Sequence, residues 1–527
     1  MARTVRPETG SRAGAVRPAG RRGAWWATVV PTVVTLGVGG RYLGRSSIWT
    51  DEAATWRNAR LPLGSMVHGT LHTQDAVLLP YYLCMHVWTA LGTQAWVLRL
   101  PSLLAAAATT GLLTVLARRW LAPGWVLFAG LLLACNPLFV RWSIEARPYA
   151  LATMFSVLCT GALLDAVERR RRRHWLLYGL WCVGMLLFHL FAVFVLCAQV
   201  LAVAVARRAA LRPLVVTLVG VGVVTSPLAA VAAGQTAQVD WIPRATPGTF
   251  LSALTAIAGG HAPAGALALC ALAVALAAGR APARSARRLR ALLVVAWAVV
   301  PAALLVATSF AHPLYVDRYL LVSVPGVALA EAMAARLLWE RVRAWRAPPR
   351  PALVGALGAV AVVTVVVGAP LWLARTSVRA VAAPYYYDDF RSASTALGHE
   401  LAPGLDALVV VPAVAGQGFA YYSADAGLRD RLLHPVALAF PRLAAAGGAP
   451  VATEAAAGLV AAPRGAPARL GALSCADVLV VGRHPDAGTP LPAFSLNGSA
   501  CRLVGARTFG LVWVARARPG GERPFSG

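Results

Sequence analysis

The chain alternates between long apolar stretches and short segments that hold most of its charged residues. Nine of the apolar stretches are long enough to cross about 30 Å of hydrocarbon as a helix, or nearly so. They lie near residues 24–43, 98–117, 121–140, 148–167, 214–233, 263–279, 291–310, 319–335 and 352–373. A tenth stretch, 175–206, is too long for one ordinary span. This pattern predicts an α-helical protein that crosses a membrane many times.

The composition excludes an ordinary soluble protein. Hydrophobic residues make up 58% of the 527 residues and charged residues only 13%, about half the share usual in a soluble domain. No water-soluble interior holds that many apolar side chains, so the lipid bilayer must surround much of the chain. All 49 basic residues are arginine, and with 21 acidic residues they give a net charge of +28. The arginines lie in groups between apolar stretches, a pattern typical of membrane topology, so we expect no nucleic-acid partner.

The arginine groups also predict an orientation, because cytoplasmic segments carry the excess of Lys and Arg. Arginines flank both ends of 175–206, which places both ends inside and predicts two short spans that meet near His189. The prediction is then eleven spans in the plasma membrane, with a basic cytoplasmic tail at 1–23 and the C-terminus outside. The inner segments hold 26 arginines, whereas the short outer loops 141–147, 234–248 and 311–318 hold four.

This topology divides the chain into a membrane domain at 24–373 and an extracytoplasmic domain at 374–527. The membrane domain includes a first outer loop at 44–97. Within it, Val77–Leu91 is predicted to lie in the membrane interface, because a crossing there would put the next arginines outside. The outer domain is predicted to be α/β, with a helix ending near Leu401 and β-branched runs at 407–414, 477–482 and 511–517.

The eight cysteines form no metal-binding or disulfide framework. Six lie in apolar stretches, where Cys packs as a small hydrophobic residue. Cys475 and Cys501 lie in the predicted outer domain, where they could form a disulfide or simply pack in strands.

Two adjacent carboxylates, Asp51 and Glu52, follow the first predicted span in the segment Trp49-Thr50-Asp51-Glu52. One interpretation is a helix start, with Thr50 or Asp51 as N-cap and acid favoured in the first turn. The other is that one carboxylate is a general base, since partial desolvation raises the pKa of a carboxyl group into a useful range.

Three further groups of polar residues carry possible chemistry. His72 and Asp75 could share a helical face and bind a divalent metal or a sugar, or simply lie at the lipid–water boundary. Arg147, in Glu145-Ala146-Arg147-Pro148-Tyr149, could hold a phosphate with its planar fork, or pair with Glu145 beside an interfacial Tyr149. His189 lies at the predicted outer tip of 175–206.

Asp317-Arg318-Tyr319 enters the tenth predicted span from outside and offers a second phosphate-binding arginine. Under the charge-derived topology all of these groups lie on the same outer face. A site at the bilayer surface would bring together Asp51, Asp75, Arg147, His189 and Arg318.

These motifs resemble those of the GT-C superfamily of polyprenyl-phosphate-sugar-dependent glycosyltransferases, in particular the bacterial protein O-mannosyltransferase and aminoarabinose-transferase family. The resemblance covers roughly residues 25–375. It rests on Trp49-Thr50-Asp51-Glu52-Ala53, Asp75 with Tyr81-Tyr82, Leu98-Arg99-Leu100-Pro101-Ser102, Glu145-Ala146-Arg147-Pro148-Tyr149 and Asp317-Arg318-Tyr319. Where many relatives have His-Pro-Pro, this chain has His72-Thr73-Gln74-Asp75.

The resemblance implies a GT-C-like membrane enzyme that transfers a hexose or pentose from a polyprenyl phosphate to an acceptor outside the cytoplasm, with inversion. The acceptor could be a lipid, a glycan or a protein, and a divalent metal cation could take part. We assign catalysis to Asp51, with Glu52 orienting it or binding a metal and Asp75 as the reserve base. Arg147 and Arg318 are assigned to the donor phosphate. Substrate binding is assigned to His72, Tyr82, Tyr149 and His189.

Two other functions remain open. One is a transporter or flippase of lipid-linked sugars, which would carry polar residues at the middle of the membrane. The predicted spans hold few ionisable residues there, with Asp165 and Glu331 both towards the inner ends. The other is a non-catalytic membrane protein whose outer domain binds envelope glycan.

Overall fold

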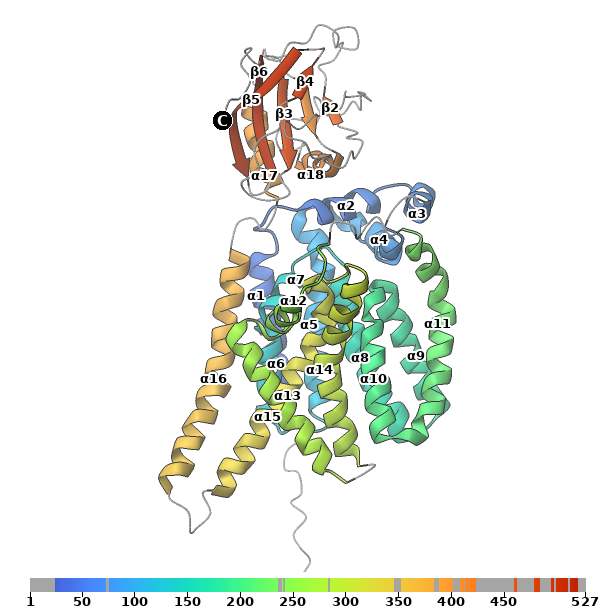
Figure 1. The fold of residues 1–527 in the computed structure, drawn as a ribbon, viewed down its shortest axis with the longest axis vertical. Helices are drawn as coiled ribbons and strands as arrows, with labels where there is room; N and C mark the ends of the chain where they lie inside the picture. The colour runs from blue at the N-terminus through green and yellow to red at the C-terminus, as the bar shows by residue number, and fades with distance from the viewer. Residues whose placement is uncertain are drawn as a thin grey trace, which may run out of the picture.

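The fold is built from long helices capped at one end by a smaller domain (Figure 1). In the computed structural model, the described residues are 24–72, 75–235, 239, 242–282, 285–345, 352–382, 388–400, 408–411, 413–422, 459–461, 478–483, 494–496, 499–509 and 512–519.

Every predicted span contains a helix. Within the described residues, seven helices are long and apolar enough to cross a membrane. They are α5 (Ala95–Ala117), α8 (Tyr149–Arg169), α11 (Leu211–Ala233), α13 (His261–Arg280), α14 (Ala286–Ala311), α15 (Val324–Trp345) and α16 (Ala352–Ala382). A mostly helical, multi-pass membrane protein is therefore confirmed.

The other predicted spans contain shorter helices, so the count of eleven spans stays a prediction. These are α1 (Trp26–Tyr42), α6 (Pro123–Ala134), α9 (Arg172–Phe188) and α10 (Val193–Ala206). The stretch 175–206 does divide at His189, whose extended backbone separates α9 from η3 (Leu190–Ala192) and α10.

The stretch 121–140 is not the single helix that we expected. It divides into α6 and the short α7 (Pro137–Trp142). Pro137 cannot continue α6 because it lacks a backbone N–H. Asn136 caps α7, accepting a hydrogen bond from the Phe139 backbone N–H at 3.2 Å. This break leads the chain into the segment that carries Arg147.

The helices pack around a large apolar core in which Trp142 and Trp297 are fully buried. Outward-facing side chains on the same helices are also apolar. On α11, for example, Val216 is 66% exposed and Val223 is 68% exposed. Apolar side chains both in the core and on the outer surface of the helix bundle are expected where lipid is the solvent.

The first outer loop folds into short helices that lie across one end of the bundle (Figure 1). They are α2 (Thr50–Ala59), α3 (Leu63–His72), η1 (Ala76–Leu78), α4 (Leu79–Trp88) and η2 (Thr89–Leu91). The predicted interfacial segment Val77–Leu91 is thus divided among three elements. Its longest helix, α4, has 10 residues and extends only about 15 Å, which is too short to cross a bilayer.

Two further elements shape this end of the bundle. The 12-residue helix α12 (Pro247–Ala258) follows α11, and the 3₁₀ helix η6 (Asp317–Ser323) leads into α15. Another 3₁₀ turn, η4 (Arg208–Ala210), precedes α11 at the opposite end.

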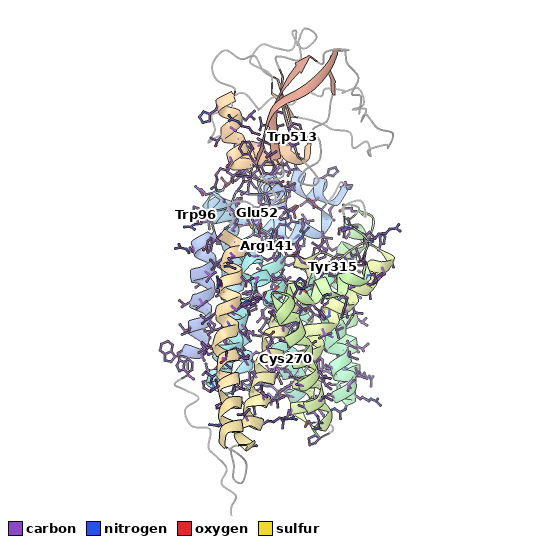
Figure 2. The ribbon with its side chains drawn as sticks, turned by 60° about the vertical axis from the view of Figure 1, so that its left-hand side comes forward. Glu52, Trp96, Arg141, Cys270, Tyr315 and Trp513 are labelled. Carbon is purple, nitrogen blue, oxygen red and sulfur yellow. The ribbon has the colours of Figure 1, made fainter. Side chains whose placement is uncertain are left out.

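The C-terminal part forms a six-stranded sheet, with helix α17 (Phe390–Glu400) packed against its strands and helix α18 (Ala413–Tyr422) between the sheet and α2 (Figure 1 and Figure 2). The strand order is β2-β1-β3-β6-β5-β4, and β1 is parallel to β3. The strands are β1 (Leu408–Val411), β2 (Leu459–Ala461), β3 (Val478–Arg483), β4 (Phe494–Leu496), β5 (Ser499–Phe509) and β6 (Val512–Pro519).

The three predicted β-branched runs correspond to β1, β3 and β6, whereas the sequence analysis missed β2, β4 and β5. Helix α16 continues to Ala382, beyond the predicted end of the last span at residue 373. Cys475 and the side chain of Cys501 lie outside the described residues, so their pairing stays a prediction.

Candidate active site

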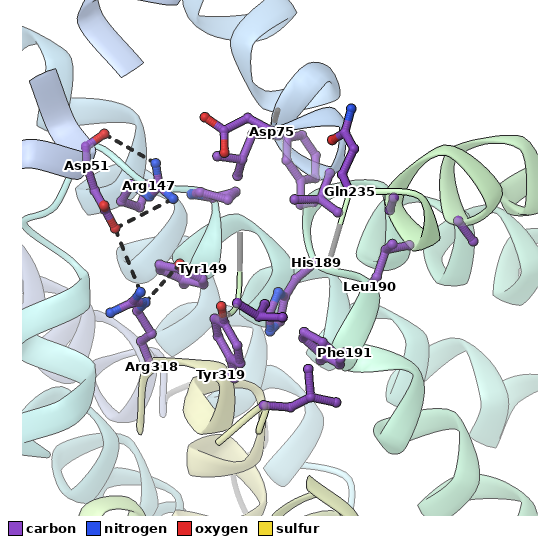
Figure 3. Close-up of a pocket in the computed structure, with 18 of the residues that line it drawn as sticks. Asp51, Asp75, Arg147, Tyr149, His189, Leu190, Phe191, Gln235, Arg318 and Tyr319 are labelled. Carbon is purple, nitrogen blue, oxygen red and sulfur yellow. Dashed lines mark hydrogen bonds and ion pairs between the residues drawn. The ribbon is translucent and has the colours of Figure 1, made fainter. Parts of the chain in front are cut away.

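A cavity of about 390 Å³ lies between the first outer loop and the end of the helix bundle. Its walls include all five side chains that we expected to meet at the outer face: Asp51, Asp75, Arg147, His189 and Arg318 (Figure 3). They come from α2, the residue before η1, the segment after α7, the α9–η3 junction and η6. The structure therefore brings together residues that are distant in the sequence.

The Asp51 carboxylate lies between two guanidinium groups (Figure 3). Its Oδ2 atom is 3.7 Å from Nη2 of Arg147 and 3.8 Å from Nη2 of Arg318. Arg147 also donates a hydrogen bond to the Asp51 backbone carbonyl at 3.2 Å. Both arginine side chains are 9% exposed, whereas Asp51 is 27% exposed. One accessible carboxylate thus faces two buried positive charges.

Helix α2 does not start as the N-cap interpretation predicted. The N-cap is Trp49, and neither Thr50 nor Asp51 caps the helix. Instead, the buried carboxylate of Asp388, from the C-terminal part, accepts hydrogen bonds from the Thr50 backbone N–H at 3.3 Å and from the Thr50 hydroxyl at 2.6 Å. A carboxylate at this position satisfies a free amide and favours the helix dipole. Asp51 is therefore not needed as a cap.

Replacing Asp388 by Ala should loosen the first turn of α2. Loss of a helix cap costs about 0.5–2 kcal/mol, so the backbone amides of this turn should exchange with deuterium faster. Hydrogen-exchange mass spectrometry of the purified protein measures this.

Asp389→Ala is the matched control. Asp389 accepts from the Ser392 backbone N–H at 3.1 Å, so its loss should loosen α17 and leave α2 unchanged. Unchanged exchange of α2 in Asp388→Ala would show that the contact does not hold the helix.

Glu52 does not line the cavity, so the interpretation in which it binds a metal there is wrong, whereas its orienting role towards Asp51 stays a prediction. It is fully buried and forms a two-bond ion pair with Arg99, with Nε–Oε1 at 2.7 Å and Nη2–Oε2 at 2.6 Å. Its Oε1 atom also accepts from the Ala146 backbone N–H at 2.8 Å. Its oxygens are occupied by these donors and it does not line the cavity, so Glu52 can act on Asp51 only by holding the segment that carries it.

Arg99 is the residue that the sequence analysis named without giving it a role. Besides Glu52, its guanidinium donates to the carbonyls of Leu43, Ser46 and Ser47 at 2.9, 3.1 and 3.0 Å. It therefore joins α5 to the chain that leads into α2. Together with the Glu52–Ala146 bond, this network fixes the segments that carry Asp51 and Arg147.

Glu145 does not pair with Arg147, as the interfacial interpretation had it. Its Oε2 atom accepts from the Trp49 indole N–H at 2.5 Å. Burial, and then the nearby Glu52 charge, raise the pKa of Glu145 to about 8. Its carboxyl group therefore takes up a proton more readily than an ordinary glutamate.

Arg318 is surrounded by aromatic rings. It donates from Nε to the Tyr149 hydroxyl at 3.1 Å. Its guanidinium also lies 5.7 Å from the centre of the Trp142 ring and 5.6 Å from that of Tyr319. These contacts hold the cation in place without neutralising it.

His189 packs against this aromatic group, with its ring centre 4.9 Å from that of Tyr319. Burial and the nearby Arg318 charge lower the pKa of His189 to about 3. Its imidazole is therefore neutral at physiological pH, and within the described part of the chain its buried Nε2 atom has no hydrogen-bond partner.

Asp75 has a left-handed backbone, with φ of 70° and ψ of 23°. Its Oδ2 atom accepts from the Tyr82 hydroxyl at 3.2 Å. Burial raises the pKa of the Asp75 carboxyl, opposed by the Arg147 charge. Tyr82 thus reaches the site through Asp75 and does not line the cavity.

Gln235 holds the Asp75 segment in place and was missed by the sequence analysis. Its Oε1 atom accepts from the Ala76 backbone N–H at 2.9 Å, and its Nε2 donates to the carbonyls of Thr70 and Leu71 at 3.1 and 3.2 Å. The available signal was its position as the first polar side chain after the apolar stretch 214–233.

His72 does not line the cavity, so its substrate-binding role stays a prediction. It is exposed at the end of α3, stacks on His68 with ring centres 4.3 Å apart, and does not line the cavity. It does not share a helical face with Asp75, because α3 ends at His72. Within the described residues, no three His, Cys, Asp or Glu side chains converge as a metal site.

Part of the chain matches a known protein family in sequence. Residues 75–231 match the family model described as dolichyl-phosphate-mannose-protein mannosyltransferase. This segment contains Asp75, Arg147 and His189. Among curated proteins, none matches the chain.

Solved structures match nearly the whole chain. The structure of ArnT from Cupriavidus metallidurans bound to undecaprenyl phosphate has a TM-score of 0.54 and 17% identity, over 94% of this chain and 98% of that chain. The chain has the GT-C fold. The apo state of the same ArnT matches with a TM-score of 0.51 and 16% identity, over 93% of this chain and 97% of that chain.

A third structure, the Archaeoglobus fulgidus oligosaccharyltransferase tethered with an acceptor peptide, is 12% identical, with a TM-score of 0.45 over 72% of this chain and 58% of that chain. The resemblance to GT-C glycosyltransferases that the motifs predicted is confirmed by the family model and by the ArnT match.

Proposed function

We propose that this GT-C protein is a membrane glycosyltransferase that moves a sugar from a polyprenyl phosphate to an acceptor hydroxyl at the outer face of the membrane. The single observation that carries this proposal is the Asp51 carboxylate between Arg147 and Arg318, in a cavity at the end of the bundle that carries the C-terminal domain. The similarity to ArnT bound to undecaprenyl phosphate, and to the family described as dolichyl-phosphate-mannose-protein mannosyltransferase, supports a lipid-phosphate donor.

The two arginines are suited to a phosphate. Each guanidinium is planar and permanently charged, so it can form paired hydrogen bonds with phosphate oxygens. The ion pairs with Asp51 are long, at 3.7 and 3.8 Å, and the Arg147 Nε atom has no partner within the described residues. A donor phosphate would therefore replace the Asp51 carboxylate as the partner of both arginines.

The rest of the cavity is suited to a lipid chain. Leu190, Phe191, Ala229 and Leu314 line the cavity, and Leu190 and Phe191 lie on its side away from Asp51 (Figure 3). Ala229 belongs to α11, the helix whose valines are strongly exposed. This apolar wall would hold the first isoprene units beside the phosphate.

Replacement of the Asp51 carboxylate by phosphate at Arg147 and Arg318 would also free Asp51 to act as the base. Once phosphate binds the arginines, the Asp51 carboxylate is free to accept the proton of the acceptor hydroxyl. The acceptor oxygen then forms a bond to the anomeric carbon as the bond from that carbon to the phosphate oxygen breaks. The lipid phosphate leaves with its charge stabilised by Arg147 and Arg318, and the anomeric configuration is inverted.

The sugar that we propose is a mannose-like hexose or a related pentose. Membranes containing the protein, supplied with radiolabelled undecaprenyl-phosphate mannose, should convert the label into a product that no longer partitions with the donor. Arg147→Lys should weaken donor binding and slow transfer, because a point charge does not reproduce the planar fork. Transfer no faster than in membranes lacking the protein, for mannose and pentose donors alike, would refute the proposal.

The rate of transfer should depend on the charge of Asp75. We propose that its carboxylate accepts a hydrogen bond from a substrate hydroxyl, with Asp75 as the reserve base. Since burial raises its pKa, the group becomes protonated at a higher pH than an ordinary aspartate. The rate should therefore fall as the pH drops through this raised pKa. In Asp75→Asn, the pH–rate profile should lose this acid limb, and its persistence would assign the limb to another group.

A further inference from the structure

Two adjoining cavities lie at the opposite end of the bundle from the proposed active site, with volumes of about 590 and 250 Å³. They are formed where α13 ends, α14 begins and α15 ends, far from the C-terminal domain in Figure 1. Ala277, Arg287 and Leu337 line both cavities. The two cavities therefore share part of their walls, and together they are called the recess below.

Five arginines line this recess, against one carboxylate. Two of the arginines are already paired: Arg336 with Glu340 at 2.8 Å and Arg290 with Glu168 at 2.9 Å. Arg280, Arg287 and Arg341 are exposed, and none has an ion-pair partner within the described part of the chain. The larger cavity therefore has an uncompensated positive charge from three different helices.

The walls behind these arginines are apolar. Leu276 of α13 and Leu338 of α15 are each 50% exposed, and Ala273 and Leu337 complete the lining. A cationic rim above an apolar groove matches an anionic phospholipid, whose phosphate would meet the arginines while an acyl chain lies along the groove. A free inorganic anion would use only the rim.

We propose that this recess binds one anionic phospholipid by its phosphate group. The site is independent of the proposed sugar transfer, since it shares no residue with the active-site cavity. Basic pockets between membrane helices recognise such lipids through charge near the headgroup level. The carboxylate of Glu340, held by Arg336, limits the positive charge of the rim.

The test titrates the purified full-length protein with phosphatidylglycerol or phosphatidylcholine. Native mass spectrometry measures how much of each lipid is bound. Wild type should bind phosphatidylglycerol at least about tenfold more tightly than phosphatidylcholine. The triple variant Arg280→Gln, Arg287→Gln, Arg341→Gln should lose this preference. Glu340→Gln should strengthen phosphatidylglycerol binding, because it frees Arg336; a merely misfolded variant would not produce this change.

The matched control replaces Arg171, Arg172 and Arg173 by Gln. These arginines are exposed at the α8–α9 junction at the same end of the bundle and line neither cavity. This variant removes the same charge and should keep the lipid preference. Equal binding of both lipids to wild type, equal weakening by the control, or displacement of the lipid by millimolar inorganic phosphate would each overturn the proposal.

Discussion

Asp51→Asn should reduce sugar transfer by a factor of about 10²–10⁴, the usual contribution of a general base. The amide keeps the size of the side chain but cannot accept the acceptor's proton. Binding of undecaprenyl phosphate should be retained or strengthened, because the carboxylate that competes for Arg147 and Arg318 is gone. When the two are measured separately, turnover should therefore fall while the affinity for the donor stays the same or rises.

This pair of measurements separates the three roles open to Asp51. A helix cap is excluded by the structure, since Trp49 is the N-cap. If Asp51 only held the two arginines in place, the Asn variant would bind donor more weakly and turn over normally once saturated. Full turnover in Asp51→Asn would remove the base assignment and transfer it to Asp75, for which Asp75→Asn is the matched variant.

Glu52→Gln should cost about 3–5 kcal/mol of folding free energy, as expected when one partner of a buried ion pair is removed. Arg99 would remain fully buried with its charge uncompensated. The variant protein should unfold at a clearly lower temperature in detergent and should lose donor binding and turnover together. Thermal unfolding monitored by tryptophan fluorescence gives the stability change.

Glu145→Gln is the control for Glu52→Gln, because it changes a second buried glutamate nearby in the same way. Burial raises the pKa of Glu145 and so favours the protonated acid, which Gln resembles, and Gln keeps an oxygen for the Trp49 N–H. This variant should be nearly as stable as wild type. Equal stability of Glu52→Gln and Glu145→Gln would show that the Arg99 pair contributes little.

The helices could be predicted well because lipid imposes a simple rule on length and polarity. The division of 175–206 at His189 followed from charge alone, and it is confirmed by α9 and α10. The break at Pro137 was missed because the surrounding residues are uniformly apolar, so hydropathy gives no boundary there. Local backbone chemistry determined that position, through the missing N–H of proline.

The meeting of five polar residues in one cavity was also predictable, because topology placed all of them at the same face. Their individual roles were not. Glu52 and Asp51 are neighbours in sequence, but successive residues on a helix point in different directions. One therefore reaches the cavity and the other Arg99. The contacts of Gln235 and Asp388 depend on tertiary packing, which no local pattern contains.

The cap on α2 also sets an order of events during biosynthesis. Thr50 and Asp388 are 338 residues apart, and a ribosome adding about 5–20 residues per second needs roughly 20–70 s to make that length of chain. Throughout this interval the first turn of α2 has no partner from Asp388, while the membrane helices between them are being made. The turn that carries Asp51 is therefore among the last parts of the candidate active site to be completed. A chain truncated before Asp388 would carry Asp51, Arg147 and Arg318, but without the contact at the start of α2, the helix that carries Asp51.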